Sequence, residues 1–109
     1  MTANTSRSHD NTSIQSYLAI IHAIVKNVLQ TNDFQMYLFG SFAQNKSVPS
    51  SDIDIAIATT QPLAAYALAL VRDQLEESTI PYHVDIVDLR QVNEQFREAV
   101  QRQGILWQG

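Results

Sequence analysis

Apolar residues recur along the chain with two different periods, and each change of period marks an expected element. In residues 13–30 they fall three and four positions apart, which predicts an amphipathic helix with Ser13 as its N-cap. The same spacing predicts helices over residues 61–78 and 91–103. Gly104 is expected to follow the last helix as its C′ residue.

Three shorter segments have the patterns of β-strands. Residues 52–58 alternate strictly, so three isoleucines face a core while two aspartates and two alanines face the other side. Residues 34–39 form a short apolar run, and residues 83–88 alternate again. Residues 105–107 are expected to add an edge strand or to dock on the core. Between the first two strands, residues 41–44 are expected to form a helical turn and residues 45–51 a loop.

These elements predict one α+β domain with a mixed sheet of about three to four strands and helices packed on one face. The chain has 109 residues, which suffices for a single small core. Residues 13–109 are interpreted as the domain, and residues 1–12, rich in Ser, Thr and Asn, as a flexible leader. The leader lacks the apolar centre of a signal peptide, so a cytoplasmic protein is expected.

Composition narrows the possible chemistry. The chain has no cysteine, which excludes disulfides, thiolate metal sites and cysteine nucleophiles. Its net charge of -4 disfavours direct binding to nucleic acid, because no basic surplus can neutralise phosphates. The remaining candidates for chemistry are carboxylates, hydroxyls and backbone N–H groups.

One segment combines these groups. Gly40-Ser41 is followed by ten residues and then by Asp52-Ile53-Asp54. Two carboxylates at this spacing on a strand share a face, and a Gly-Ser turn before a helical start offers free N–H groups. A cation site thus lies beside an anion site, as binding of a metal-bound nucleoside triphosphate requires. The alternative is a plain turn followed by two surface aspartates.

The motif resembles the active-site signature of the nucleotidyltransferases of the DNA polymerase beta superfamily, in particular the minimal nucleotidyltransferase (MNT) proteins. The resemblance covers roughly residues 36–89 and implies a small polymerase-beta-like palm fold. It implies that Gly40 and Ser41 contact the phosphates of ATP or another NTP. It also implies catalysis by Asp52 and Asp54 with a third carboxylate from a later strand.

Asp85 is the candidate for that third carboxylate. Strand alternation places Asp85 on the same face as His83 and places Val84 on the other face. Asp88 also lies on that other face, or past the strand end. By resemblance, Asp85 completes a site for two Mg²⁺ ions with Asp52 and Asp54, or accepts the proton of the attacking hydroxyl.

The resemblance further implies a partner and a reaction. The chain is too short for a separate acceptor domain, and MNT proteins typically pair with a HEPN-domain toxin encoded nearby. The implied function is an antitoxin that transfers NMP, with AMP the expected group, to a hydroxyl of that toxin.

Two alternatives stay open at this stage. Many relatives carry basic residues at the positions of Phe42 and Gln44, which favours a module that neutralises its partner by contact alone. A free-standing transferase acting on a small hydroxylated acceptor is the second alternative.

Overall fold

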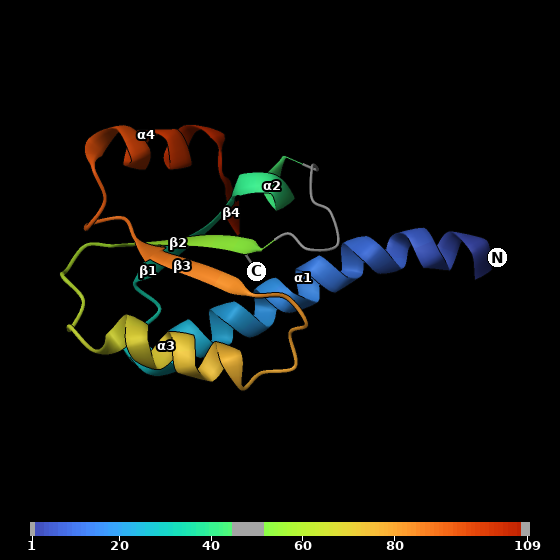
Figure 1. Ribbon diagram of the computed structural model, residues 1–109, viewed down its shortest axis with the longest axis horizontal. Helices are drawn as coiled ribbons and strands as arrows, with labels where there is room; N and C mark the ends of the chain where they lie inside the picture. Colours follow the sequence, from blue (N-terminus) through green and yellow to red (C-terminus); the bar gives the residue numbers. More distant parts are fainter. Residues whose placement is uncertain (1, 45–51, 108–109) are drawn as a thin grey trace.

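The computed structural model describes the backbone of residues 2–44 and 52–107, and within these ranges the side chains from residue 14 onward. The predicted loop over residues 45–51 therefore lies outside the described residues. The described elements, in chain order, are α1 (Thr2–Leu29), β1 (Phe34–Phe39), α2 (Gly40–Ala43), β2 (Ile53–Thr59), α3 (Ala67–Glu76), β3 (Val84–Asp88), α4 (Glu94–Gln103) and β4 (Ile105–Trp107) (Figure 1).

The four strands form one mixed sheet in the order β3-β2-β1-β4. β1 runs antiparallel to both β2 and β4, whereas β2 and β3 are parallel. Parallel neighbours need a crossover connection, and α3 supplies it between β2 and β3. The predicted α+β fold with a mixed sheet is confirmed.

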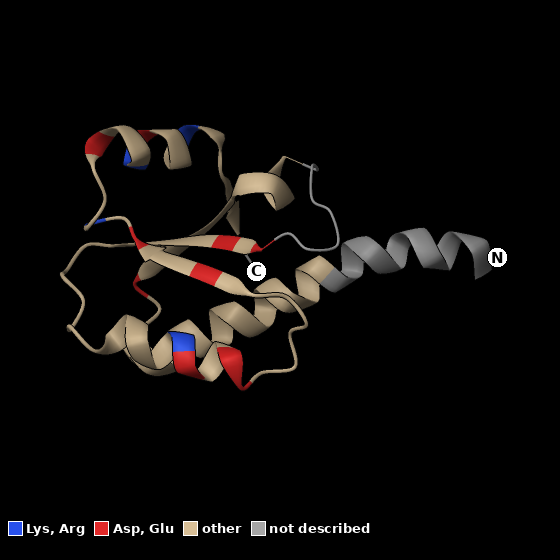
Figure 2. Ribbon diagram, in the orientation of Figure 1, with Lys and Arg blue, Asp and Glu red and all other residues tan. Residues whose placement is uncertain are grey.

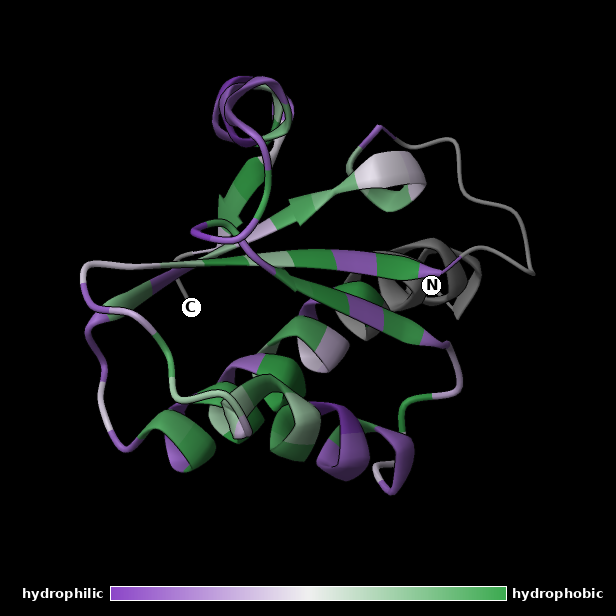
Figure 3. Ribbon diagram, turned by 60° about the vertical axis from the view of Figure 1, so that its left-hand side comes forward, coloured by the Kyte–Doolittle hydropathy of each residue, from purple (hydrophilic) through white to green (hydrophobic). Residues whose placement is uncertain are grey.

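The main core lies between the sheet and the pair α1 and α3, which cover the same face (Figure 1). The alternating isoleucines of β2 explain this arrangement, because period 2 directs all three to one face. Figure 3 shows the hydrophobic colouring of the strands and of the helix sides turned toward them. The fully buried large side chains of this core are Ile21, Val25, Met36, Ile53, Ile55, Ile57, Val71 and Ile86.

The second face of the sheet is covered as well, by α4 (Figure 1). The prediction that helices pack on one face only is therefore wrong. Ala56 is fully buried there together with Val100 of α4, and the rings of Phe39 and Phe96 meet edge to face with centroids 5.5 Å apart. Small alanines on β2 leave room for a helix, so this side is a second, smaller core and not a solvated surface.

Two helices begin later than the spacing predicts. The Thr59 hydroxyl donates to the carbonyl of Gln61 at 2.7 Å, which turns the chain after β2, and α3 begins only at Ala67. At α4 the Asn93 side chain accepts a hydrogen bond from the N–H of Phe96 at 2.8 Å and acts as the N-cap. The capping residue therefore sets the start of α4 at Glu94, although the apolar spacing extends further back.

The N-terminal end of α1 and the C-terminal end of α4 also differ from expectation. The helix begins at Thr2 and runs through Ser13, and the division into a leader and a domain stays a prediction. Gly104 ends α4 with φ −76°, which is not the left-handed C′ geometry. Glycine is required here because there is no room for a side chain, since a Cβ would lie 2.5 Å from the carbonyl oxygen of Val100.

Within the described residues, no helix has both the length and the apolar character needed to cross a membrane.

The cap of α4 generates a stability prediction. Asn93→Ala should lower the free energy of unfolding by about 1 kcal/mol, because the N–H of Phe96 loses its acceptor. Urea denaturation measures this change. Asn93→Ser keeps a capping oxygen and should stay near the parent value, and the exposed change Gln95→Ala in the same turn should cost nothing. An equal loss in Gln95→Ala would show that the cap does not set the stability of this helix.

Candidate active site

Gly40 stands at the corner where β1 ends and α2 begins, and its backbone needs a glycine for two reasons. Its φ is +76°, in the left-handed region that side chains disfavour. A Cβ at this position would overlap Oδ2 of Asp54 and lie 3.0 Å from its Cγ. The Gly-Ser turn and the second aspartate of the motif are therefore in direct contact, as the sequence predicts.

Asp54 lies directly opposite Asp85 across the parallel pair β2 and β3. Adjacent strands are about 4.8 Å apart, so the two carboxylates project side by side from one face. Figure 2 shows these acidic bands next to each other on the two strands. On its other side Asp54 pairs with Phe39, the residue before Gly40. The register thus gathers the turn and both carboxylates at one end of the sheet.

Asp52 precedes the first residue of β2 and is exposed. It adds to the negative charge around Asp54, which is half-buried. Burial raises the pKa of the Asp54 carboxyl first, and the charges of Asp85 and Asp52 raise it further, while His83 opposes them. The site therefore has more negative charge than its described surroundings balance.

Asp88 is not part of this site. It pairs with Ile57, on the opposite face of the sheet, and only 7% of it is exposed. Its Oδ1 accepts a hydrogen bond from the N–H of Arg90 at 2.9 Å, so it closes the turn after β3. The predicted placement of Asp85 and Asp88 on opposite faces is confirmed, because β3 runs without a bulge from Val84 to Asp88. That Asp85 is the third carboxylate of the site stays a prediction.

Ser41 is half-buried in the first turn of α2, where backbone N–H groups have no partner within the helix. The next residue, Phe42, packs edge to face on Tyr82 with centroids 5.2 Å apart, and Tyr82 packs in the same way on Tyr17 at 5.8 Å. These aromatic contacts hold α2 against the segment before β3 and against α1. Sequence reasoning missed them, since no spacing relates Phe42 to a tyrosine forty positions later.

The carboxylates fit a hard cation by their chemistry, although they do not form a closed cage. In the part of the chain that the structure describes, no three His, Asp or Glu side chains converge as a metal site would require. Asp54 and Asp85 still present oxygen ligands side by side, and Mg²⁺ is usually bound by one or two carboxylates plus substrate phosphates. The excess negative charge at Asp54 is what a divalent cation would neutralise. Lys46 could also supply positive charge near the phosphates, but it lies outside the described residues.

A shallow hollow extends from this site along the edge of β3. Tyr82, His83 and Asp85 line it from the strand side, and Arg72 lines it from α3. Its volume is about 320 Å³. Asp85 therefore belongs to the carboxylate pair and also lines this hollow.

Comparison with known proteins agrees with this geometry. Residues 21–107 match the family described as Polymerase beta, Nucleotidyltransferase. The chain is 35% identical over 82 residues to a Haemophilus influenzae protein described as a probable protein adenylyltransferase MntA, covering 73% of this chain and 72% of that protein.

Solved structures with the same fold include two toxin–antitoxin complexes. One was determined with AMP-PNP and superimposes with a TM-score of 0.63 and 28% identity, over 81% of this chain and 73% of that one. The other contains a tri-AMPylated Shewanella oneidensis HEPN toxin with its MNT antitoxin, with a TM-score of 0.56 and 25% identity over 84% and 72% of the two chains. With most of its length matched and its carboxylate pair beside the glycine turn, the chain belongs to the polymerase beta nucleotidyltransferase family.

Proposed function

We propose that this chain is a minimal nucleotidyltransferase that transfers AMP from ATP to a hydroxyl group of a HEPN-domain partner and so acts as its antitoxin in the cytoplasm. The observation that carries the proposal is the pairing of Asp54 with Asp85 in contact with the Gly40 turn. The similarity to an MntA protein and to MNT antitoxins solved with HEPN toxins supports the choice of acceptor.

ATP would lie with its phosphates at the turn between β1 and α2. Gly40 leaves space for a phosphate next to the backbone, and Ser41 can donate its N–H and its hydroxyl. Asp52, Asp54 and Asp85 would hold Mg²⁺ between themselves and these phosphates. When bound there, Mg²⁺ neutralises the negative charge that develops on the phosphates during transfer.

The transfer itself needs one nucleophile and one base. The acceptor hydroxyl oxygen attacks the α-phosphorus of ATP, and the bond from that phosphorus to the oxygen bridging to the β-phosphate breaks. AMP becomes attached to the acceptor and pyrophosphate leaves. Asp85 would accept the proton of the attacking hydroxyl, and its exposure beside the hollow along β3 supports this role.

A partner protein is the natural source of the acceptor. The long described helices all pack on the two faces of a single sheet, with α1 and α3 on one side and α4 on the other. Among these elements none forms a second domain that could hold a bulky substrate against the site. An acceptor delivered by another folded chain requires no such domain.

One observation favours the contact-only alternative. Phe42, at a position where many relatives are basic, packs on Tyr82 and offers no charge to a triphosphate. Within the described part of the turn, the backbone N–H groups and Ser41 would then have to bind the phosphates together with the metal. The experiments below separate this alternative from a transferase.

Binding of Mg²⁺ and ATP should be coupled through the paired carboxylates. The double change Asp52→Asn/Asp54→Asn should abolish the enhancement of ATP binding by Mg²⁺, as measured by isothermal titration. Asp73→Asn, an exposed carboxylate on α3, removes a like charge away from the site and should keep the coupling. Unchanged coupling in the double variant would mean that the metal site lies elsewhere.

The charge excess at Asp54 generates a pH prediction. Because the folded state raises the pKa of Asp54 above the ordinary value of 3.8, ionisation of this group opposes folding as the pH rises through the raised pKa. Without metal, Asp54→Asn should therefore raise the melting temperature at neutral pH. The difference between variant and parent should vanish below pH 3.8, where the carboxyl is protonated in both states. A difference that persists unchanged in acid would contradict the stated origin of the shift.

Transfer should depend on Asp85 and on the partner. With labelled ATP, Mg²⁺ and the neighbouring HEPN protein, label should appear covalently on the partner, and Asp85→Asn should reduce it at least about a hundredfold by removing the base. Asp88→Asn should leave labelling intact, because an asparagine can still accept the hydrogen bond from Arg90.

Other outcomes would favour the alternatives. A tight complex without label, in which Asp54→Asn still neutralises the toxin, would establish the contact-only module. Turnover of a small hydroxylated acceptor without any partner would establish the free-standing transferase. Loss of labelling in Asp88→Asn but not in Asp85→Asn would contradict the assignment of the third carboxylate.

A further inference from the structure

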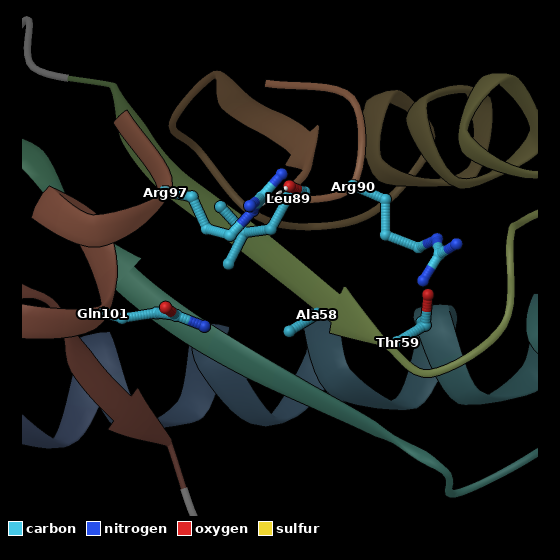
Figure 4. A pocket seen from close by; sticks show the side chains of 6 residues that line it. All are labelled: Ala58, Thr59, Leu89, Arg90, Arg97 and Gln101. Atoms are coloured by element: carbon cyan, nitrogen blue, oxygen red, sulfur yellow. Dashed lines mark hydrogen bonds between the residues drawn. The ribbon is translucent and has the colours of Figure 1, made fainter. Parts of the chain in front are cut away.

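A second pocket lies on the same face of the sheet as the carboxylates but further along β2. It is lined from β2 by Ala58 and Thr59, from the end of β3 by Leu89 and Arg90, and from α4 by Arg97 and Gln101 (Figure 4). Ala58 follows Asp54 by four positions and so shares its face. At about 3.3 Å per residue the two positions are roughly 13 Å apart. This pocket is thus separate from the candidate active site.

Two guanidinium groups approach the pocket from different elements, and each is held in place by a main-chain carbonyl. Nε of Arg97 donates to the carbonyl of Leu89 at 3.0 Å, and Nη1 of Arg90 donates to the carbonyl of Thr60 at 3.3 Å. Arg97 therefore keeps the edge formed by its two Nη groups, and Arg90 keeps the edge formed by Nε and Nη2. Each free edge carries two parallel N–H donors, the arrangement that matches two oxygens of one anion.

The charge of this pocket contrasts with that of the chain. The whole protein has a net charge of -4, yet none of the described residues that line this pocket is acidic and two are arginines. In Figure 4 the side chains of Arg97 and Gln101 extend from α4 toward β2, while Arg90 reaches toward Thr59 from the other side. The Gln101 amide adds a further donor to the lining. The pocket is about 370 Å³ in volume, within the range of roughly 300–1,000 Å³ that is typical of small-ligand sites.

We propose that this pocket is an anion site that binds a phosphate group, either as free phosphate or as part of a nucleotide. Two guanidinium edges suit a doubly charged anion with several oxygens better than a single carboxylate. The proposal does not rest on the proposed transfer reaction, because none of the residues involved belongs to the candidate active site.

The absence of divalent metal in the assay separates the two sites. Without metal, the carboxylates at Asp52, Asp54 and Asp85 repel anions, so phosphate bound under these conditions reports the arginine pocket. We expect the full chain in EDTA to bind inorganic phosphate saturably, as followed by NMR titration of the Arg90 and Arg97 side-chain signals. Metal-free ATP tests the second source. Tighter binding of ATP than of phosphate, lost in the same variants, would identify a nucleotide, and equal affinity would identify free phosphate.

The matched variants lie on one helix and its neighbouring turn. Arg90→Gln and Arg97→Gln should each weaken phosphate binding about tenfold or more, the loss expected for a charge-assisted hydrogen bond. Arg102→Gln removes the same charge from an exposed position of α4 outside the pocket and should change the affinity by less than about twofold.

A second pair of variants guards against misfolding, since both arginines also donate to backbone carbonyls. Gln101→Glu places a carboxylate in the pocket without removing either guanidinium bond and should abolish binding, whereas the exposed change Gln95→Glu on the same helix should not. Equal weakening by Gln101→Glu and Gln95→Glu, or by Arg90→Gln and Arg102→Gln, would reduce the effect to net charge and overturn the proposal. So would the absence of saturable phosphate binding by the parent chain.

Discussion

The register between β2 and β3 is the constraint on which both the core and the site depend. It places Asp54 opposite Asp85 on one face and Ile55 opposite Ile86 on the other. Two hydrogen bonds of 2.9 Å bracket the pair, from the N–H of Ile53 to the carbonyl of His83 and from the N–H of Leu89 to the carbonyl of Ile57. A slip by one residue would turn Asp85 into the core and Ile86 out of it. A slip that separates the two carboxylates would therefore disrupt the core as well.

Electrostatics alone would disfavour this register. Two carboxylates side by side, with Asp52 nearby, repel each other, and burial of Asp54 adds to the cost of its charge. The opposite face outweighs this cost. Ile53, Ile55 and Ile57 are fully buried, and each fully buried side chain of this size stabilises the fold by about 1.5–3 kcal/mol. Hydrophobic burial thus maintains an arrangement of charges that only a bound cation would favour, which explains how a site can be preformed before its ligand arrives.

Sequence reasoning succeeded where one strand carried both signals. Strict alternation in residues 52–58 and 83–88 identifies the core face and the carboxylate face of each strand. The resemblance to the MNT proteins then brought Asp54 and Asp85 together. It failed where the decisive contact joins distant segments. The sequence predicted helices on one face of the sheet, because alanine carries little hydrophobic signal, yet Ala56 packs with Val100 under α4 on the other face. The contact of Phe42 with Tyr82 and the shared lining of one pocket by Arg90 and Arg97 likewise depend on tertiary structure that no local spacing encodes.

The second face of the sheet consequently has two ends of opposite charge. The end at Gly40 carries the carboxylates, and the end at Arg90 and Arg97 carries guanidinium groups, with the apolar contact of Phe39 and Phe96 under α4 on the same face. The two ends lie roughly 13 Å apart along β2, beyond the Debye length of about 8 Å at physiological ionic strength. A ligand bound at one end would therefore have little electrostatic influence on the other end. A change of charge at α4 would alter the proposed anion binding there, and the proposed metal and triphosphate chemistry at the β1–α2 turn would still be governed by the β2–β3 register.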